Sequence, residues 1–166
     1  WNSEHLILQK LREKFSQEKL ELRVDANGGF TFAEAELVLK QLSDLQIHSI
    51  EQPIKAGNWN DMAKLCMHTP TPIALDEELI GIVDFDKKKE LLRTVNPQYI
   101  ILKPSLVGGF SGCDEWISLA EQQNIGWWIT SALESNIGLN AISQYTFTKD
   151  NKMPQGLGTG GLFTNN

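Results

Sequence analysis

The stretch Tyr99-Ile100-Ile101-Leu102-Lys103-Pro104-Ser105 joins an apolar run to a lysine and a proline. A short run of this kind, rich in β-branched residues, is typical of a buried strand. Proline has no backbone N–H to donate to a neighbouring strand, so the strand is predicted to stop beside Pro104. Lys103 therefore lies where a strand passes into a loop.

Three earlier apolar segments also end in a charged residue. These residues are Asp25, Glu51 and Asp76, and together with Lys103 they recur every 25 to 27 residues. A near-constant period of this length predicts a repeated unit of one strand and one helix.

Helical patterns lie between the predicted strands. Thr31 and Glu34 have the spacing of a capping box at the start of one helix. Residues suited to capping begin four others, namely Asn58, Asp84, Ser111 and Ser135. The predicted helices span residues 3–17, 31–45, 58–67, 84–92, 111–123 and 135–147. The predicted strands span residues 21–27, 47–52, 73–77, 99–103 and 126–131, with a short sixth strand within 155–163.

This alternation predicts parallel strands joined by right-handed crossovers. The first strand is not followed by Gly-x-Gly-x-x-Gly, and the sequence has no phosphate-binding lysine loop, which argues against a nucleotide-binding doubly wound sheet. A (β/α)8 barrel fits the even period better and places all strand carboxyl ends on one face. Because about six strands are counted instead of eight, we expect an α/β fold: a partial TIM-type (β/α)8 barrel that lacks its first strands.

Composition narrows the class of protein. The chain has 166 residues, 41% of them hydrophobic, and we expect one domain over residues 1–166. A net charge of −6 without a basic cluster argues against a nucleic-acid partner. The sequence has neither an apolar run of about 18 residues nor a secretory signal pattern, so we expect no membrane partner. Cys66 and Cys113 lack metal-motif spacing, and we interpret them as free thiols in a reducing cytoplasm.

The three acids are candidate metal ligands. Neighbouring strands lie about 4.8 Å apart, and like charges at such spacing repel by about 4 kcal/mol at an effective dielectric near 20. A hard divalent cation with oxygen ligands offsets this repulsion, and Mg²⁺ suits a site of few carboxylates. We therefore predict a Mg²⁺ site formed by Asp25, Glu51 and Asp76. The alternative interpretation is that each acid is an ordinary loop residue.

Lys103 is the candidate catalytic residue. Pro104 follows it and four apolar residues precede it, so we expect the lysine to be partly buried. Burial and a nearby cation both lower the pKa of a lysine. Such a lysine acts as a general base, or as a cation beside a developing anion. The alternative is a lysine that extends into solvent.

Two sets of motifs resemble known enzymes. The strand-end set resembles the enolase superfamily: Val24-Asp25-Ala26-Asn27, Glu51-Gln52-Pro53, Leu75-Asp76-Glu77 and Leu102-Lys103-Pro104. The later set is similar to the o-succinylbenzoate synthase family within it: residues 103–109, 131–138 and 156–161. The resemblance implies a Mg²⁺ held by Asp25, Glu51 and Asp76, and an acid/base lysine at Lys103.

The resemblance also implies a reaction. Members of that family dehydrate 2-succinyl-6-hydroxy-2,4-cyclohexadiene-1-carboxylate to o-succinylbenzoate in menaquinone synthesis, starting with loss of the proton α to a carboxylate. The family uses a second lysine, in a Lys-x-Lys on the preceding strand, and an amino-terminal capping domain. Neither is found upstream of Asp25. We therefore expect this chain alone to be inactive.

Substrate contacts and alternatives complete the expectations. Asn27 and Ser131 lie at strand ends and are candidate hydrogen-bond donors to a small-molecule carboxylate substrate, although capping or loop bonding is equally compatible with each. Two alternatives are also compatible with the sequence. One is another reaction of the enolase superfamily, such as N-succinylamino acid racemisation, and the other is a fragment without catalytic activity. Open barrel edges predict possible self-association.

Overall fold

The chain is described from a computed structural model that covers residues 1–158. Its centre is one sheet in which each strand pairs in parallel with the next along the chain. The strands are β1 (Arg23–Asp25), β2 (Ser49–Glu51), β3 (Ile73–Leu75), β4 (Tyr99–Leu102) and β5 (Gly126–Ile129). All five predicted strands are confirmed, and each is shorter than its predicted range. Parallel pairing in chain order is the arrangement of a barrel wall.

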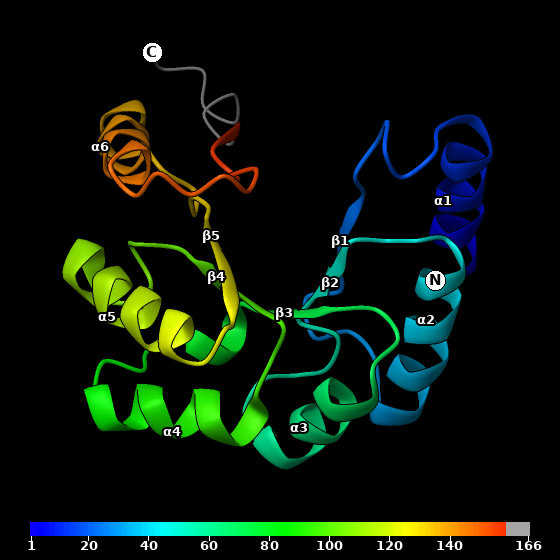
Figure 1. The fold of residues 1–166 in the computed structure, drawn as a ribbon, viewed down its shortest axis with the longest axis horizontal. Helices are drawn as coiled ribbons and strands as arrows, with labels where there is room; N and C mark the ends of the chain where they lie inside the picture. The colour runs from blue at the N-terminus through cyan, green and yellow to red at the C-terminus, as the bar shows by residue number, and fades with distance from the viewer. Residues whose placement is uncertain (159–166) are drawn as a thin grey trace.

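Helices connect the strands, and α2 to α5 line one side of the sheet (Figure 1). The helices are α1 (Asn2–Lys14), α2 (Phe32–Asp44), α3 (Trp59–His68), α4 (Phe85–Val95), α5 (Gly109–Gln122) and α6 (Asn136–Phe147), with a 3₁₀ turn, η1 (Glu77–Leu79), after β3. In Figure 1, α1 and α6 lie at opposite ends of the row of helices. The sheet therefore curves with its helices on the outer side.

The predicted capping residues are confirmed for four helices. Thr31 forms the capping box with Glu34 at the start of α2. Asn58, Asp84 and Ser135 each accept a hydrogen bond from a backbone N–H in the first turn of α3, α4 and α6. These side chains satisfy N–H groups that have no partner within the helix.

The predicted start of α5 at Ser111 is wrong. The helix begins at Gly109, and its N-cap is Gly108, which has no side chain to accept a bond. Gly108 and Gly109 have φ angles of 98° and 72°, a region open to glycine at little cost. The N–H of Gly109 donates to the carbonyl of Pro104 at 2.8 Å. This tight turn brings the chain into the helix before Ser111 is reached.

The two faces of the sheet have different roles. Side chains of one face, such as Ile50, Leu75 and Ile100, join the main core beneath the helices. On the other face, Ala74, Ile101 and Trp128 form a second, smaller cluster. Trp127 belongs to the main core, so the two adjacent tryptophans face opposite ways, as alternation along a strand requires. The smaller cluster marks the inner face of the barrel wall.

The predicted sixth strand is only partly within the described residues. Gly156 forms an isolated parallel bridge with Thr130, and its N–H donates to the carbonyl of Ile129 at 2.8 Å. Residues 159–163 of the predicted strand lie outside the described residues. Within residues 1–158, β1 pairs only with β2. Self-association along that edge, and the single domain over residues 1–166, stay predictions.

Of the helices in residues 1–158, none combines the length and apolar character needed to cross a membrane.

Candidate functional site

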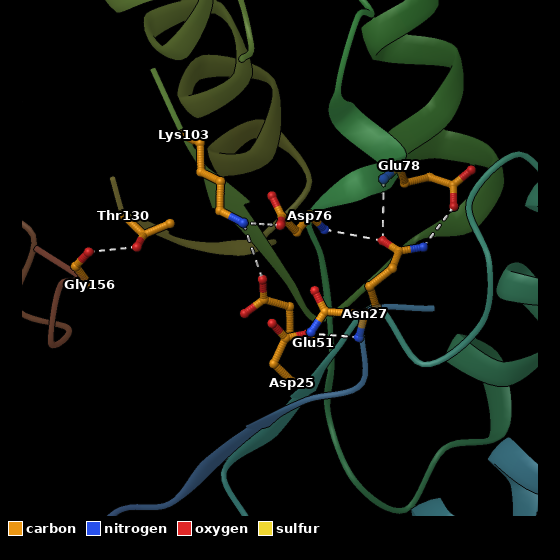
Figure 2. A network of polar contacts seen from close by, with 9 residues as sticks. Asp25, Asn27, Glu51, Asp76, Glu78, Lys103, Thr130 and Gly156 are labelled. Carbon is orange, nitrogen blue, oxygen red and sulfur yellow. Dashed lines mark hydrogen bonds and ion pairs between the residues drawn. The ribbon is translucent and has the colours of Figure 1, made fainter. Parts of the chain in front are cut away.

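The carboxyl ends of the strands bring four charged side chains together (Figure 2). Asp25 and Glu51 are the last residues of β1 and β2, and they are direct partners in the ladder. Asp76 and Lys103 each follow the last residue of the next two strands, β3 and β4. Asp76 and Lys103 lie on the inner face, because Ala74 and Ile101, two positions earlier in each strand, belong to the inner cluster. Arg23, two positions before Asp25, lies over the ring of Trp128 in that cluster, so Asp25 and its ladder partner share this face.

Lys103 lies between two of the acids. Its Nζ donates a hydrogen bond to Asp76 Oδ2 and lies 3.7 Å from Glu51 Oε1. About a fifth of the Lys103 and Glu51 side chains is exposed, whereas Asp76 is buried. The expected partial burial of Lys103 is therefore confirmed. The ammonium group neutralises part of the negative charge that converges at this edge.

The carboxylates strongly affect one another. Burial, followed by repulsion from Asp25 and Asp76, raises the pKa of Glu51 to about 8. Asp76 Oδ1 is buried and has no hydrogen-bond partner among residues 1–158. A buried carboxylate oxygen without a partner costs free energy, because it has lost water and gained nothing in return. Both observations indicate a shortage of positive charge at the site.

The pKa of Lys103 shifts against the expectation from sequence. Burial lowers this pKa, but the hydrogen bond and charge of Asp76, and then the charges of Glu51 and Glu77, outweigh the burial and raise it. The expectation counted burial and a cation, and omitted the attraction of three nearby carboxylates. Lys103 is therefore held as an ammonium group in this arrangement.

The chemistry of the donors fits a hard divalent cation. The candidate ligands are Asp25, Glu51 and Asp76, with carboxylate oxygens of the kind that Mg²⁺ prefers, and the partnerless Asp76 Oδ1 is one such donor. As the side chains stand, no group of three acids, histidines or cysteines among residues 1–158 is arranged to hold a metal ion. Binding by all three therefore requires their side chains to move from the positions that they have in the structure. The metal ligands stay a prediction.

The two predicted substrate-binding residues lie apart from each other. Asn27 is exposed in the turn after β1, with a φ of 47°, and its N–H donates to Asp25 Oδ1 at 2.8 Å. Ser131 is buried just beyond β5, where its N–H donates to the carbonyl of Gly156. Asn27 therefore helps to orient a predicted metal ligand, and its role toward substrate, like that of Ser131, stays a prediction.

Further residues at the site were not predicted from the sequence. Gln52 is completely buried, and it donates to the carboxylate of Glu78, which is also buried. On the inner face, Arg23 lies over the ring of Trp128 at 4.3 Å and donates to the carbonyl of Pro154. Gln52 was noted only as part of a motif, and nothing in the sequence distinguishes a buried glutamine at this position from an exposed one.

A depression of about 440 Å³ lies over the inner face beside the acids. Asp25 and Glu51 line it from one side, and Trp128 of β5 and Thr130, the residue after β5, line it from the other. The size is within the range of small-molecule sites, about 300–1,000 Å³. The acids therefore border a space that suits a small substrate.

Comparison with known proteins identifies the family of the chain. A family profile described as Enolase C-terminal domain-like matches residues 2–160. The chain belongs to this family. The match confirms the resemblance of the strand-end motifs to the enolase superfamily.

Two curated relatives of the chain carry different names. o-Succinylbenzoate synthase from Desulfotalea psychrophila is 54% identical over 166 residues, which are 100% of this chain and 45% of that protein. N-succinylamino acid racemase from Thermus thermophilus is 32% identical over 138 residues, 83% of this chain and 35% of that protein. The chain thus spans less than half the length of these relatives.

Solved structures confirm the fold class. The crystal structure of MenC from Desulfotalea psychrophila matches with a TM-score of 0.96 and 55% identity, over 99% of this chain and 46% of that one. Muconate cycloisomerase from Pseudomonas fluorescens matches with a TM-score of 0.86 and 25% identity, over 99% and 45%. The chain is a mixed α/β partial barrel of the enolase superfamily.

Proposed function

We propose that this chain forms the metal-binding and lysine-bearing part of an o-succinylbenzoate synthase. The observation that carries the proposal is the convergence of Lys103 with the acids of three adjacent strand ends. Identity of 54% to an o-succinylbenzoate synthase along the whole chain supports the same conclusion. The substrate would be the cyclohexadiene carboxylate named above, and the reaction its dehydration to an aromatic product in menaquinone synthesis.

The acids and the lysine have complementary tasks in this proposal. Asp25, Glu51 and Asp76 would hold Mg²⁺, which when bound offsets the charge that develops on the substrate carboxylate as the α-proton leaves. Lys103 presents an ammonium group at the same edge and would stabilise the developing anion from one side of the substrate. Loss of the β-hydroxyl then makes the ring aromatic.

A second base is needed on the other side of the substrate. The family resemblance assigns it to a lysine of a Lys-x-Lys on the strand before the one that bears Asp25, and residues 1–24 contain no such motif. We therefore expect residues 1–166 alone to give no dehydration. Activity is expected from the protein expressed from its complete reading frame when Mg²⁺ is present. We expect that protein to lie in a reducing cytoplasm.

The test is a lysine substitution in that complete protein. Lys103→Ala should lower the rate of aromatic product formation, followed by ultraviolet absorbance, by roughly 10²-fold or more, because a positioned acid–base or electrostatic group is lost. Lys87→Ala, which removes an exposed lysine on α4, is the matched control and should leave the rate unchanged. Equal rates for both variants would show that Lys103 is not part of the machinery.

N-succinylamino acid racemisation is the second candidate, favoured by 32% identity to the racemase from Thermus thermophilus. An epimerase that holds a substrate amine with Asp-x-Asp on the final strand is disfavoured, because residues 155–161 contain no acid. Exchange of the α-proton of an N-succinylamino acid with solvent deuterium, measured beside dehydration, separates the two activities. Absence of both in the complete protein would favour a non-catalytic role.

A further inference from the structure

Gln52 connects the three strand ends that bear the acids. It follows Glu51 at the end of β2, and it is completely buried. Its N–H donates to the carbonyl of Ala74 in β3 at 2.9 Å, and its carbonyl accepts from the N–H of Gly28, in the turn after β1, at 2.7 Å. One residue thus fixes the spacing of β1, β2 and β3 where Asp25, Glu51 and Asp76 emerge.

The side chain of Gln52 continues this connection. Its Oε1 accepts from the backbone N–H groups of Asp76 and Glu78, at 3.2 and 3.3 Å. Its Nε2 donates to the carbonyl of Ile54 at 3.0 Å and to Glu78 Oε2 at 3.1 Å. Two donors and two acceptor positions are the full capacity of an amide, so every one is used. Figure 2 shows Glu78 on the side of Asp76 away from Lys103.

Glu78 fixes the side chain of Gln52 through their hydrogen bond. Its carboxylate is buried and accepts a second hydrogen bond from the N–H of Gly57 at 2.7 Å. Gln52 itself has a φ of 38°, a left-handed conformation that costs a non-glycine residue free energy. The surrounding contacts therefore hold Gln52 in a conformation that it would not adopt by local preference.

Asp76 depends on this support. It precedes η1 without a capping bond from its own side chain, and within the described part of the chain its Oδ1 has no hydrogen-bond partner. The Gln52 amide oxygen fixes the backbone at Asp76 and again at Glu78, so it sets the direction in which the Asp76 side chain leaves the main chain. Lys103 Nζ donates a hydrogen bond to the other oxygen of this carboxylate, Oδ2.

We propose that Gln52, backed by Glu78, is a positioning residue that orients Asp76 for cation binding. The proposal rests on the proposed function, since it assumes that Asp76 is a metal ligand. Outer residues that orient metal ligands typically change metal affinity by about 10- to 100-fold when they are altered. Substitution of a residue that only stabilises the fold would lower the free energy of unfolding and leave the Mg²⁺ affinity of the folded protein unchanged.

A matched control lies at the opposite end of β3. The Oε1 of Gln98 accepts from the N–H of Ile73 at 2.9 Å, and its Nε2 donates to the carbonyl of Cys66 at 3.1 Å. Gln98 therefore fastens the amino end of the strand as Gln52 fastens its carboxyl end. Gln52→Met and Gln98→Met both remove an amide and keep a side chain of similar length.

The experiment measures Mg²⁺ affinity by isothermal titration calorimetry on the protein expressed from its complete reading frame, after urea unfolding has shown each variant to be folded. Gln52→Met should weaken binding by about 10-fold or more, and Gln98→Met by less than about threefold. Equal effects of the two variants would overturn the proposal. If Gln52→Met does not fold, Gln52→Asn and Gln98→Asn, which shorten the side chain by one carbon, serve the same comparison.

The Asp76→Asn variant distinguishes the metal site from the positioning role of Gln52. If Asp76→Asn weakens Mg²⁺ binding and Gln52→Met leaves it unchanged, the metal site stands and the positioning role of Gln52 is overturned. If Asp76→Asn leaves the affinity unchanged, Asp76 is not a ligand, and both the metal site and the role of Gln52 fall.

Discussion

Gly28 shapes the turn that carries the chain away from Asp25. Its φ is 68°, and a Cβ atom at this position would lie 3.0 Å from Lys55 Cα in the loop after β2. A side chain there would push against backbone, which yields less readily than the end of a flexible side chain. The close approach also keeps the N–H of Gly28 on the carbonyl of Gln52.

Gly28→Ala should therefore lower the free energy of unfolding, by roughly 1–2 kcal/mol for the left-handed backbone and by more for the contact with Lys55. Gly81→Ala is the control, because Gly81 has a φ of 80° and no described residue has an atom within 4 Å of its Cβ position. Urea unfolding should show the larger loss for Gly28→Ala. Equal losses would mean that the loop after β2 moves aside at no cost.

Residues of the site differ in how well the sequence predicts them. Asp25, Glu51 and Lys103 are visible because each closes an apolar run at a regular period, a pattern that reflects only local structure. Gln52 and Glu78 are not visible, because their burial depends on contacts between segments 26 residues apart. The position of Lys103 Nζ between two acids also depends on side-chain rotamers, about which the sequence is silent.

At the scale of the helices and strands, prediction succeeded where a local signal decides the structure. The capping box of α2 and the side-chain caps of α3, α4 and α6 are short-range hydrogen bonds, and the residues that form them are recognisable in sequence. The start of α5 was missed because Ser111 offered a better cap than Gly108 on sequence alone. The left-handed turn at Gly108 and Gly109 overrode that preference.

This contrast between α2 and α5 gives a paired test. Thr31 Oγ1 accepts from the N–H of Glu34, so Thr31→Ala should lower the free energy of unfolding by about 1 kcal/mol. Ser111 is exposed in the first turn of α5, and Ser111→Ala should be neutral or slightly stabilising, because alanine favours a helix. Thermal unfolding of both variants checks this. A comparable loss for Ser111→Ala would restore Ser111 as a cap.

At the scale of the whole molecule, one core runs beneath the outer helices. Cys66 on α3 and Cys113 on α5 are both free thiols buried in this core, on helices that lie on either side of α4. Burial raises the pKa of each thiol to about 12. The thiolate is the reactive form of cysteine, so both thiols should be nearly inert while the core is closed.

We predict that a thiol reagent such as Ellman's modifies both cysteines slowly at pH 8 and at the same rate, because both wait for one cooperative opening of residues 1–158. At urea concentrations above the unfolding transition, both thiols should react rapidly. Single Cys66→Ala and Cys113→Ala variants identify which thiol reacts. If one reacts many times faster than the other in the native protein, the outer layer opens in parts and the single-domain prediction is wrong.

The same burial sets a direction for alkaline stability. An unfolded thiol loses its proton near the ordinary value of 9.0, whereas the folded thiols keep theirs to about 12. The folded state therefore binds the proton more tightly, and this contribution is complete below pH 9 and is lost as the pH rises toward 12. The free energy of unfolding should fall less steeply over that range in Cys113→Ala than in the unchanged chain. Parallel curves would show that the Cys113 thiol is already ionised, or already exposed, in the folded protein.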